Sequence, residues 1–227
     1  MSKQLMVCLI LVAVLVDQFM QIEGGPNTSR AGTTIKVAPT RANSKSKDGR
    51  TDLHDAAVIG NLEKVRKIIQ KGAKVDSTDK DKRKPLHLAA MYGRKTVVEE
   101  LMKNGANFDS LDQNNQTPLH LATENGQLDV VEKLIMKKAN VNFKDANGQT
   151  PLHLALEHGH KDVAEKLIRG GANVNLRDNN NQTPAETAAK SNGYINMTGS
   201  MLKGGATTTY NIFAPSQVKG AVAVTKG

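Results

Sequence analysis

The heptapeptide TPLHLAT at residues 117–123 recurs along the chain at a fixed interval. Near-copies stand at 51–57 (TDLHDAA), 84–90 (KPLHLAA) and 150–156 (TPLHLAL), and a weaker copy, TPAETAA, begins at Thr183. The interval is 33 residues each time. A second phrase keeps the same interval: KGAKVDSTD, NGANFDSLD, KKANVNFKD and GGANVNLRD. Self-similarity at such a period predicts a stack of small units, each packed on its neighbours.

Each unit is predicted to be a pair of short helices. Proline is tolerated where a helix begins, because the missing N–H has no helical partner there; these prolines are Pro85, Pro118 and Pro151. The hydroxyls of Thr117 and Thr150 precede two of them and are predicted to cap the helix starts. The first helix is predicted to end at a left-handed glycine: Gly93, Gly126 or Gly159. A second helix follows, with apolar residues at helical spacing, and ends near Gly105, Lys138 or Gly171.

The period of 33 and the T-P-L-H-x-A phrase resemble the ankyrin repeat. The resemblance covers residues 47–206 and implies an all-α fold, an ankyrin-repeat solenoid of helix-turn-helix units joined by β-hairpin-like turns. We place repeats one to five at 47–79, 80–112, 113–145, 146–178 and 179–206. Terminal repeats are expected to be atypical because their outer faces meet water. Asp52 replaces the proline in repeat one, and repeat five lacks the Leu-His pair and has a short, Gly-rich second half.

Two substitutions inside the stack are predicted to destabilise it locally, by on the order of 1 kcal/mol each. Lys84 stands where the other phrases have threonine, so a helix cap is lost. Lys138 stands where the other units have glycine, so a non-glycine residue must adopt the left-handed conformation.

The first 24 residues are predicted to be a cleaved secretory signal. Lys3 precedes an unbroken apolar run of 12 residues, Leu5 to Val16, which suits a signal and is too short to span a bilayer. The best cleavage position is Gly24 or Gly25. The alternatives are a buried apolar helix or an uncleaved membrane anchor. Cleavage would remove Cys8, the only cysteine, so the mature chain would be held by its core alone.

Residues 25–46 and 207–227 fit no repeat. The first segment has four basic residues, no acidic residue and many Ser, Thr and Asn, which predicts a flexible basic linker. The tail is small and polar with two apolar patches. It either lies along the last repeat or is disordered, and disorder is our expectation.

Catalysis and nucleic-acid binding are not indicated. The chain has no nucleophile elbow, Gly-rich phosphate loop, zinc-protease motif or kinase signature, so we expect no enzyme, no catalytic residue and no cofactor. The formal net charge is +9, but residues 47–206 hold 24 Lys and Arg against 20 Asp and Glu. Only 3% of the residues are aromatic, so few side chains could stack on bases. We therefore expect no nucleic-acid partner.

The row of equally spaced histidines invites a metal interpretation, which the spacing disfavours. Equivalent residues of successive units lie one repeat apart, and no second ligand type recurs beside them. The resemblance implies instead that these histidines are structural and hydrogen-bond the main chain between neighbouring units: His54, His87, His120 and His153. The pair His158 and His160 lies at a helix end and turn with no Cys or carboxylate cluster nearby. We therefore expect no metal site.

The resemblance implies that proteins are bound through the turn tips and the exposed side of the first helices. Repeats one and two offer apolar residues beside a cationic tip, whereas repeats three to five are rich in amides. Apolar anchors ringed by charge are typical of binding hot spots. The predicted protein-binding residues are Val58, Ile59, Lys80, Arg83, Lys84, Met91, Tyr92, Glu124 and Asn125. The alternative is that Val58 and Ile59 pack under the linker.

These patterns predict a secreted, monomeric protein-binding module that occupies an acidic partner protein and has no stable membrane insertion after signal cleavage. If it were delivered into host-cell cytoplasm as an effector, it could imitate Rel-factor inhibitors of this family. The alternative is a structural or assembly scaffold of the secretory pathway or extracellular matrix. Four glycosylation sequons agree with secretion only weakly, because such triplets are common by chance: Asn27, Asn115, Asn181 and Asn196.

Overall fold

The computed structural model describes residues 43–192, 196–203 and 206–213, and side-chain surroundings over 43–190. All of them belong to one compact unit of the chain, residues 39–227. The predicted signal at 1–24, with Cys8, lies outside the described residues, as do Asn27, most of the predicted linker and residues 214–227. Within the described part, no helix is long and apolar enough to cross a membrane.

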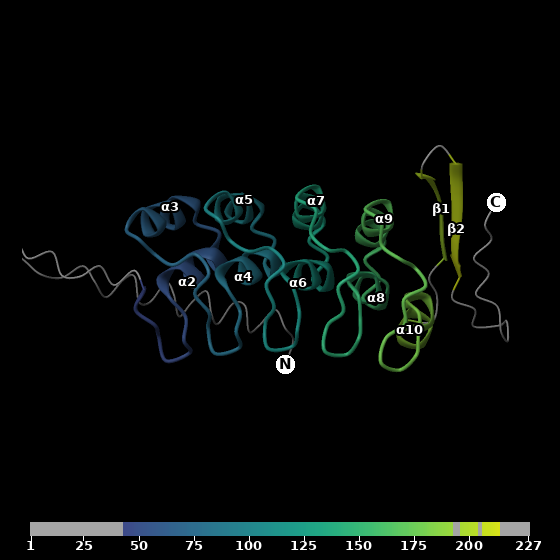
Figure 1. Ribbon diagram of the computed structural model, residues 1–227, viewed down its shortest axis with the longest axis horizontal. Helices are drawn as coiled ribbons and strands as arrows, with labels where there is room; N and C mark the ends of the chain where they lie inside the picture. The colour runs from purple at the N-terminus through teal and green to yellow at the C-terminus, as the bar shows by residue number, and fades with distance from the viewer. Residues whose placement is uncertain (1–42, 193–195, 204–205, 214–227) are drawn as a thin grey trace, which may run out of the picture. The chain divides into compact units, whose positions relative to one another are not determined.

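The described residues form nine helices in two rows, followed by a two-stranded hairpin (Figure 1). The first helices of successive repeats contact one another, and so do the second helices. The first-helix row is α2 (Asp52–Ile59), α4 (Pro85–Met91), α6 (Pro118–Glu124), α8 (Pro151–Glu157) and α10 (Pro184–Asn192). The second-helix row is α3 (Leu62–Gln70), α5 (Lys95–Lys103), α7 (Leu128–Met136) and α9 (Lys161–Arg169). The expected stack of helix pairs is therefore present.

Local sequence explains where the helices begin and end. The first helices of repeats two to five begin at their prolines, where a missing N–H leaves no helical acceptor unpaired. In repeats two to four they are followed by left-handed glycines, such as Gly93 with a φ of 67° and Gly126 with the same φ. The left-handed Lys138 has a φ of 64°, as its replacement of a glycine predicted. Lys84 makes no side-chain cap, as predicted.

The two predicted threonine caps differ from each other. Thr117 Oγ1 accepts a hydrogen bond from the His120 main-chain N–H at 3.4 Å, which confirms that cap. Thr150 Oγ1 makes no such cap. Its hydroxyl lies 2.9 Å from Nδ1 of His153, as the Thr117 hydroxyl lies 2.8 Å from Nδ1 of His120.

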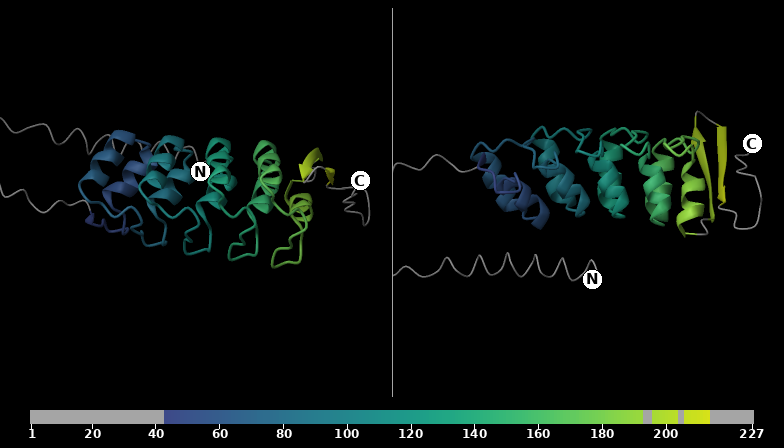
Figure 2. Two further views of the ribbon diagram at one scale, coloured as in Figure 1. Left: turned by 45° about the horizontal axis from the view of Figure 1, so that its top comes forward. Right: turned by 90° about the horizontal axis from the view of Figure 1, so that it is seen from below.

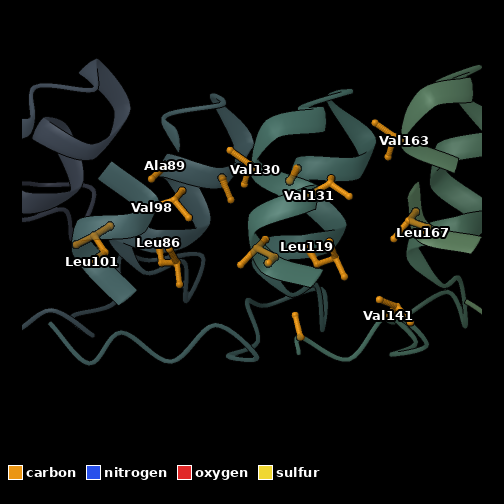
Figure 3. Close-up of a cluster of buried hydrophobic side chains, with 14 of the residues drawn as sticks. Leu86, Ala89, Val98, Leu101, Leu119, Val130, Val131, Val141, Val163 and Leu167 are labelled. Atoms are coloured by element: carbon orange, nitrogen blue, oxygen red, sulfur yellow. The ribbon is translucent and has the colours of Figure 1, made fainter. Parts of the chain in front are cut away.

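One apolar core runs continuously between the two helix rows (Figure 3). Equivalent leucines of the first helices, Leu86, Leu119 and Leu152, are fully buried. Valines of the second helices close the other side: Val97, Val98, Val130, Val131 and Val163. A single helix pair would leave half of this surface in water, so stacking is what makes each repeat stable.

The turns between repeats are joined by main-chain hydrogen bonds from one tip to the next. Lys80 N donates to Asp48 O at 3.1 Å, and Gln113 N donates to Asp81 O at 2.9 Å. The same bond recurs from Ala146 to Asn114 and from Asn179 to Asn147. Figures 1 and 2 show the tips projecting side by side from the first-helix row. The tips are thus a rigid extension of the stack and not independent loops.

The stack begins earlier than predicted. Residues 43–46, placed in the linker by the sequence analysis, belong to the turn before α2. Asn43 Oδ1 accepts from Lys74 N at 2.8 Å, and Ser46 N donates to Arg50 O at 2.7 Å. Ser46 Oγ also accepts from Arg50 N, as an aspartate side chain does in each later tip. Because Ser46 replaces that aspartate, the first tip was not recognised when the repeats were compared in sequence.

A β-hairpin follows α10, where the other repeats have a second helix. Strand β1 (Asn196–Lys203) pairs antiparallel with β2 (Ala206–Phe213), in a register that places Lys203 opposite Ala206. Disorder was therefore the wrong expectation for residues 207–213. The stretch TTTYNIF at 207–213 consists largely of β-branched and aromatic residues, which favour strands. The intervening Gly204-Gly205 is typical of a two-residue hairpin connection.

Candidate protein-binding surface

A buried aspartate organises each tip from repeat two onward. Asp79 Oδ1 accepts main-chain hydrogen bonds from Asp81 N and Arg83 N, both at 2.9 Å. The same two bonds are made in the later tips by Asp112, Asp145 and Asp178. Burial raises the pKa of the Asp145 carboxyl, while its main-chain hydrogen bonds act in the opposite direction. Because these bonds fix the backbone, the outward side chains of the tip are held in defined directions.

The predicted cationic tip is partly neutralised within the chain. The guanidinium of Arg83 pairs with Asp79 Oδ2 at 3.1 Å and also with Asp81. Lys84 Nζ pairs with Asp76 Oδ2 at 3.1 Å. Both cations are therefore half-buried partners of their own tip, and neither is available as a free positive charge. Lys80 remains exposed as predicted, and no ion pair to it occurs among residues 43–190.

Lys82 is a tip residue that the sequence-based set missed. It is exposed and adopts a φ of 58°. The equivalent residues, Gly49, Asn115, Gly148 and Asn181, are also left-handed. The signal that could have found it is the residue type at equivalent positions, because glycine and asparagine are typical of left-handed turn positions. The free cations of the tip are thus Lys80 and Lys82.

The exposed apolar residues of the first-helix row lie at its N-terminal end. Ile59 is 48% exposed and Tyr92 is 38% exposed. They are 33 residues apart, and each directly precedes a left-handed glycine, Gly60 or Gly93. The next two residues of this series are the exposed, polar Asn125 and His158. The structure thus brings Ile59 and Tyr92 onto equivalent places of neighbouring repeats and leaves the same places polar in repeats three and four.

Three other predicted site residues contribute mainly through their backbone. Val58, Met91 and Glu124 are half-buried. Each carbonyl accepts a hydrogen bond from a side chain of the next repeat: Arg94 Nε at 2.9 Å, Gln127 Nε2 at 3.4 Å and His160 Nε2 at 3.0 Å, respectively. Asn125 is exposed, but its Nδ2 donates to Leu121 O at 2.9 Å. These four residues therefore frame the surface more than they extend from it.

Nothing in the described part of the chain gathers three or more His, Cys, Asp or Glu side chains as a metal ion requires. The rings of His158 and His160 stack with their centroids 6.1 Å apart. The His160 bond to the Glu124 carbonyl ties that ring to the preceding repeat. The four equally spaced histidines each contact main-chain atoms of their helix start and of a tip.

Comparison with protein-family models agrees with this architecture. A model described as ankyrin repeats (3 copies) matches residues 53–145 and again 133–211. The chain belongs to the ankyrin-repeat family. The second match ends within β2, five residues after the boundary at 206 drawn from the sequence. A search of curated proteins found no match.

Membership of the ankyrin family indicates protein binding as the general role of this stack, because such repeats are typically protein-interaction modules. The ankyrin tips and first-helix row are then the surface to consider. On this chain, that surface has two different ends. The end formed by repeats one and two combines Ile59 and Tyr92 with Lys80 and Lys82, and the other end carries amides.

Proposed function

We propose that this chain is a secreted module of five ankyrin repeats that acts by occupying a partner protein through the surface of repeats one and two. The single observation that carries the proposal is the exposed pair Ile59 and Tyr92 on a rigid row. Large apolar side chains release bound water on association, at about 25 cal/mol per Å² of buried surface. A rigid backbone also lowers the entropy lost on binding.

The partner surface that fits is apolar with acidic residues at its edge. Lys80 and Lys82 are exposed at the tip of repeat two, and Arg83 and Lys84 have internal carboxylate partners. The attraction therefore comes from two cations and not from all four basic residues of the stretch 80–84. It would act mainly on the association rate and would weaken as salt screens it.

Secretion is the second part of the proposal, and it rests on the Lys3 and Leu5–Val16 pattern. Action inside a host cell, by imitation of a Rel-factor inhibitor, would require delivery into the cytoplasm after secretion. A scaffold role in the secretory pathway or matrix remains the alternative. Confinement of the transcript to a secretory gland would favour the effector.

Partner capture tests the binding surface directly. The tagged chain, its Tyr92→Ala variant and its His158→Ala variant are used as baits, and retained proteins are identified by mass spectrometry. Tyr92 and His158 are at equivalent places two repeats apart, so the two variants are matched. A partner retained by wild type and His158→Ala but lost by Tyr92→Ala supports the proposal. Loss with His158→Ala alone would place the site at the other end.

Secretion is tested by expressing the chain with a C-terminal tag in a eukaryotic cell. We expect the tagged protein in the medium, with an N-terminus near Gly24 or Gly25. An intact Met1 on protein retained in the cytosol would contradict secretion.

A further inference from the structure

Four buried histidines hold the repeats together through both ring nitrogens. In each, Nδ1 accepts the main-chain N–H of the residue three positions earlier, at 3.1 to 3.2 Å. In each, Nε2 lies near main-chain carbonyls of the following tip. His54 Nε2 is 3.1 Å from Arg83 O, His87 Nε2 is 3.1 Å from Ser110 O and 3.3 Å from Gln116 O, and His153 Nε2 is 3.1 Å from Gln182 O. His120 Nε2 is 3.1 Å from Phe143 O.

This geometry requires the neutral imidazole. A nitrogen that accepts an N–H must be unprotonated, so the ring proton is on Nε2 and is donated to the carbonyl. Protonation would place a second N–H at Nδ1, pointing at the main-chain N–H of the helix start. The main-chain N–H would then lose its acceptor in a fully buried place, because all four histidines are 0% exposed. In three repeats a threonine hydroxyl lies 2.8 to 2.9 Å from Nδ1 and could accept the new ring N–H, but it does not replace the acceptor that the main-chain N–H loses.

We propose that the four histidines form an acid-sensitive latch: His54, His87, His120 and His153 join the helix starts to the neighbouring tips only as neutral rings, so mild acid, which protonates these rings in the opened chain, weakens the stack. The latch is independent of which protein is bound. Its consequence is that the assembled surface is less stable in a mildly acidic compartment.

The charged groups that surround the four rings differ from one repeat to the next. His54 faces Asp79 and Asp55, with Arg50 opposing them. His87 faces Asp112, with Lys84 opposing it. His153 faces Asp178 and Glu157, with Lys144 opposing them. The interactions that act on His120 come from the main chain of Gln149 and Phe143, so His120 has the least compensation for a positive charge.

The direction of the pH effect follows from burial. Burial lowers the pKa of all four imidazoles, to about 4 for His120. In the unfolded chain their pKa is about 6.5. As the pH falls below about 6.5, the unfolded chain binds protons that the folded chain does not bind, so stability falls. The loss ends when the pH passes the folded pKa, because both states are then protonated.

Carboxyl groups act at lower pH and can be separated from the latch. Hydrogen bonds lower the pKa of Glu100 and of Glu186, so these groups also weaken the fold on acidification, but near and below their ordinary range. Burial raises the pKa of Asp145, so that group opposes the loss. Measurements between pH 7.0 and 5.5 therefore report chiefly on the histidines.

Repeat five contains a natural template for a latch-free variant. Glu186 stands at the histidine position, and its Oε2 accepts the Thr183 N–H at 2.8 Å. A glutamine has the same reach, offers an oxygen to the same N–H and does not titrate. The substitution His→Gln at the four positions thus keeps the helix-start hydrogen bond and removes the proton switch.

The experiment is equilibrium urea unfolding of the full chain at pH 7.0 and 5.5. For wild type, we expect the equilibrium constant for unfolding to rise by about 10²–10³-fold between these two pH values. Each buried histidine can contribute up to about tenfold per pH unit. For the quadruple variant His54→Gln, His87→Gln, His120→Gln, His153→Gln, we expect less than about tenfold. The matched control His158→Gln, at an exposed histidine, should behave as wild type does.

A wild-type constant that changes less than about fivefold would overturn the proposal. So would a quadruple variant with the wild-type change. If the quadruple variant does not fold, proton NMR of the wild-type rings decides the question. Four histidines should keep neutral-form shifts until the unfolding transition, and titration of these four rings in a chain that stays folded at pH 5.0 would contradict the latch.

Discussion

Repeats two and three share one backbone and present different surfaces. Their first helices begin at Pro85 and Pro118, their histidines both accept the main-chain N–H of the helix start, and their tips are fixed by Asp79 and Asp112. Yet the outward tip of repeat two is Lys80 to Arg83, whereas that of repeat three is Gln113 to Gln116. The residue before the left-handed glycine is Tyr92 in one and Asn125 in the other. The comparison teaches that the repeated residues specify the scaffold, whereas the residues that differ between repeats specify the proposed binding surface.

The largest expected effect tests whether the two scaffolds are equivalent. His120→Ala should lower the free energy of unfolding by roughly 1–3 kcal/mol, because Thr117 N–H and Phe143 C=O lose a buried partner. His87→Ala should lower it by a similar amount. Urea unfolding at pH 7 measures both. A negligible loss at either position would mean that the two repeats are not held together in the same way.

Tyr92→Ala should cost about 2 kcal/mol or more of affinity for the partner, because a large, partly exposed ring is lost from a rigid row. Asn125→Ala, at the equivalent place in repeat three, should cost less than about 0.5 kcal/mol, since an amide gives up water to bind. Surface plasmon resonance compares them once each variant is shown to fold. The reverse order would assign the site to the amide-rich end.

Thr123→Val should stabilise the fold by about 1 kcal/mol. The Thr123 hydroxyl is fully buried and has no hydrogen-bond partner among the described residues, and an unpaired buried polar group is unfavourable. The equivalent residue of repeat two is Ala90, so Ala90→Ser provides a matched comparison. A decrease in stability with Thr123→Val would show that the hydroxyl is satisfied in solution.

Lys82→Gly should stabilise the fold by on the order of 1 kcal/mol, because a lysine in the left-handed conformation is strained. Asn115→Gly, at the same tip position of repeat three, should gain only a few tenths of a kcal/mol, since asparagine tolerates that conformation better. Thermal unfolding distinguishes the two. Equal gains would mean that the positive φ carries no particular strain in Lys82.

The smallest effect concerns the free charges of the tip. Lys80→Glu combined with Lys82→Glu should slow association with an acidic partner at low salt and leave the dissociation rate nearly unchanged. Asn114→Ala combined with Asn147→Ala should change neither rate appreciably. Stopped-flow kinetics at two salt concentrations tests both pairs. An unchanged association rate in the first pair would remove acidity from the description of the partner.

Much of the fold was predictable because the same local sequence signals recur in each repeat. Pro118 indicates a helix start, His120 an inter-repeat contact and Gly126 a left-handed helix end, and equivalent residues occur in the neighbouring repeats. The candidate site was less predictable. Ile59, Tyr92 and Lys80 are exposed as expected. The sequence could not show, however, that the charges of Arg83 and Lys84 are paired within the chain. Their availability depends on whether nearby carboxylates reach them.

By itself, the sequence determined the period, the two helices of each repeat, the left-handed turns and the structural histidines, because these depend on local backbone preferences and a repeated spacing. The tertiary structure decided which side chains are left for function. It paired Lys84 with Asp76 across a turn, buried Thr123 without a partner, drew Asn43 and Ser46 into the first tip, and ended the stack in a hairpin. These outcomes depend on distances between residues that are apart in sequence, and only packing sets those distances.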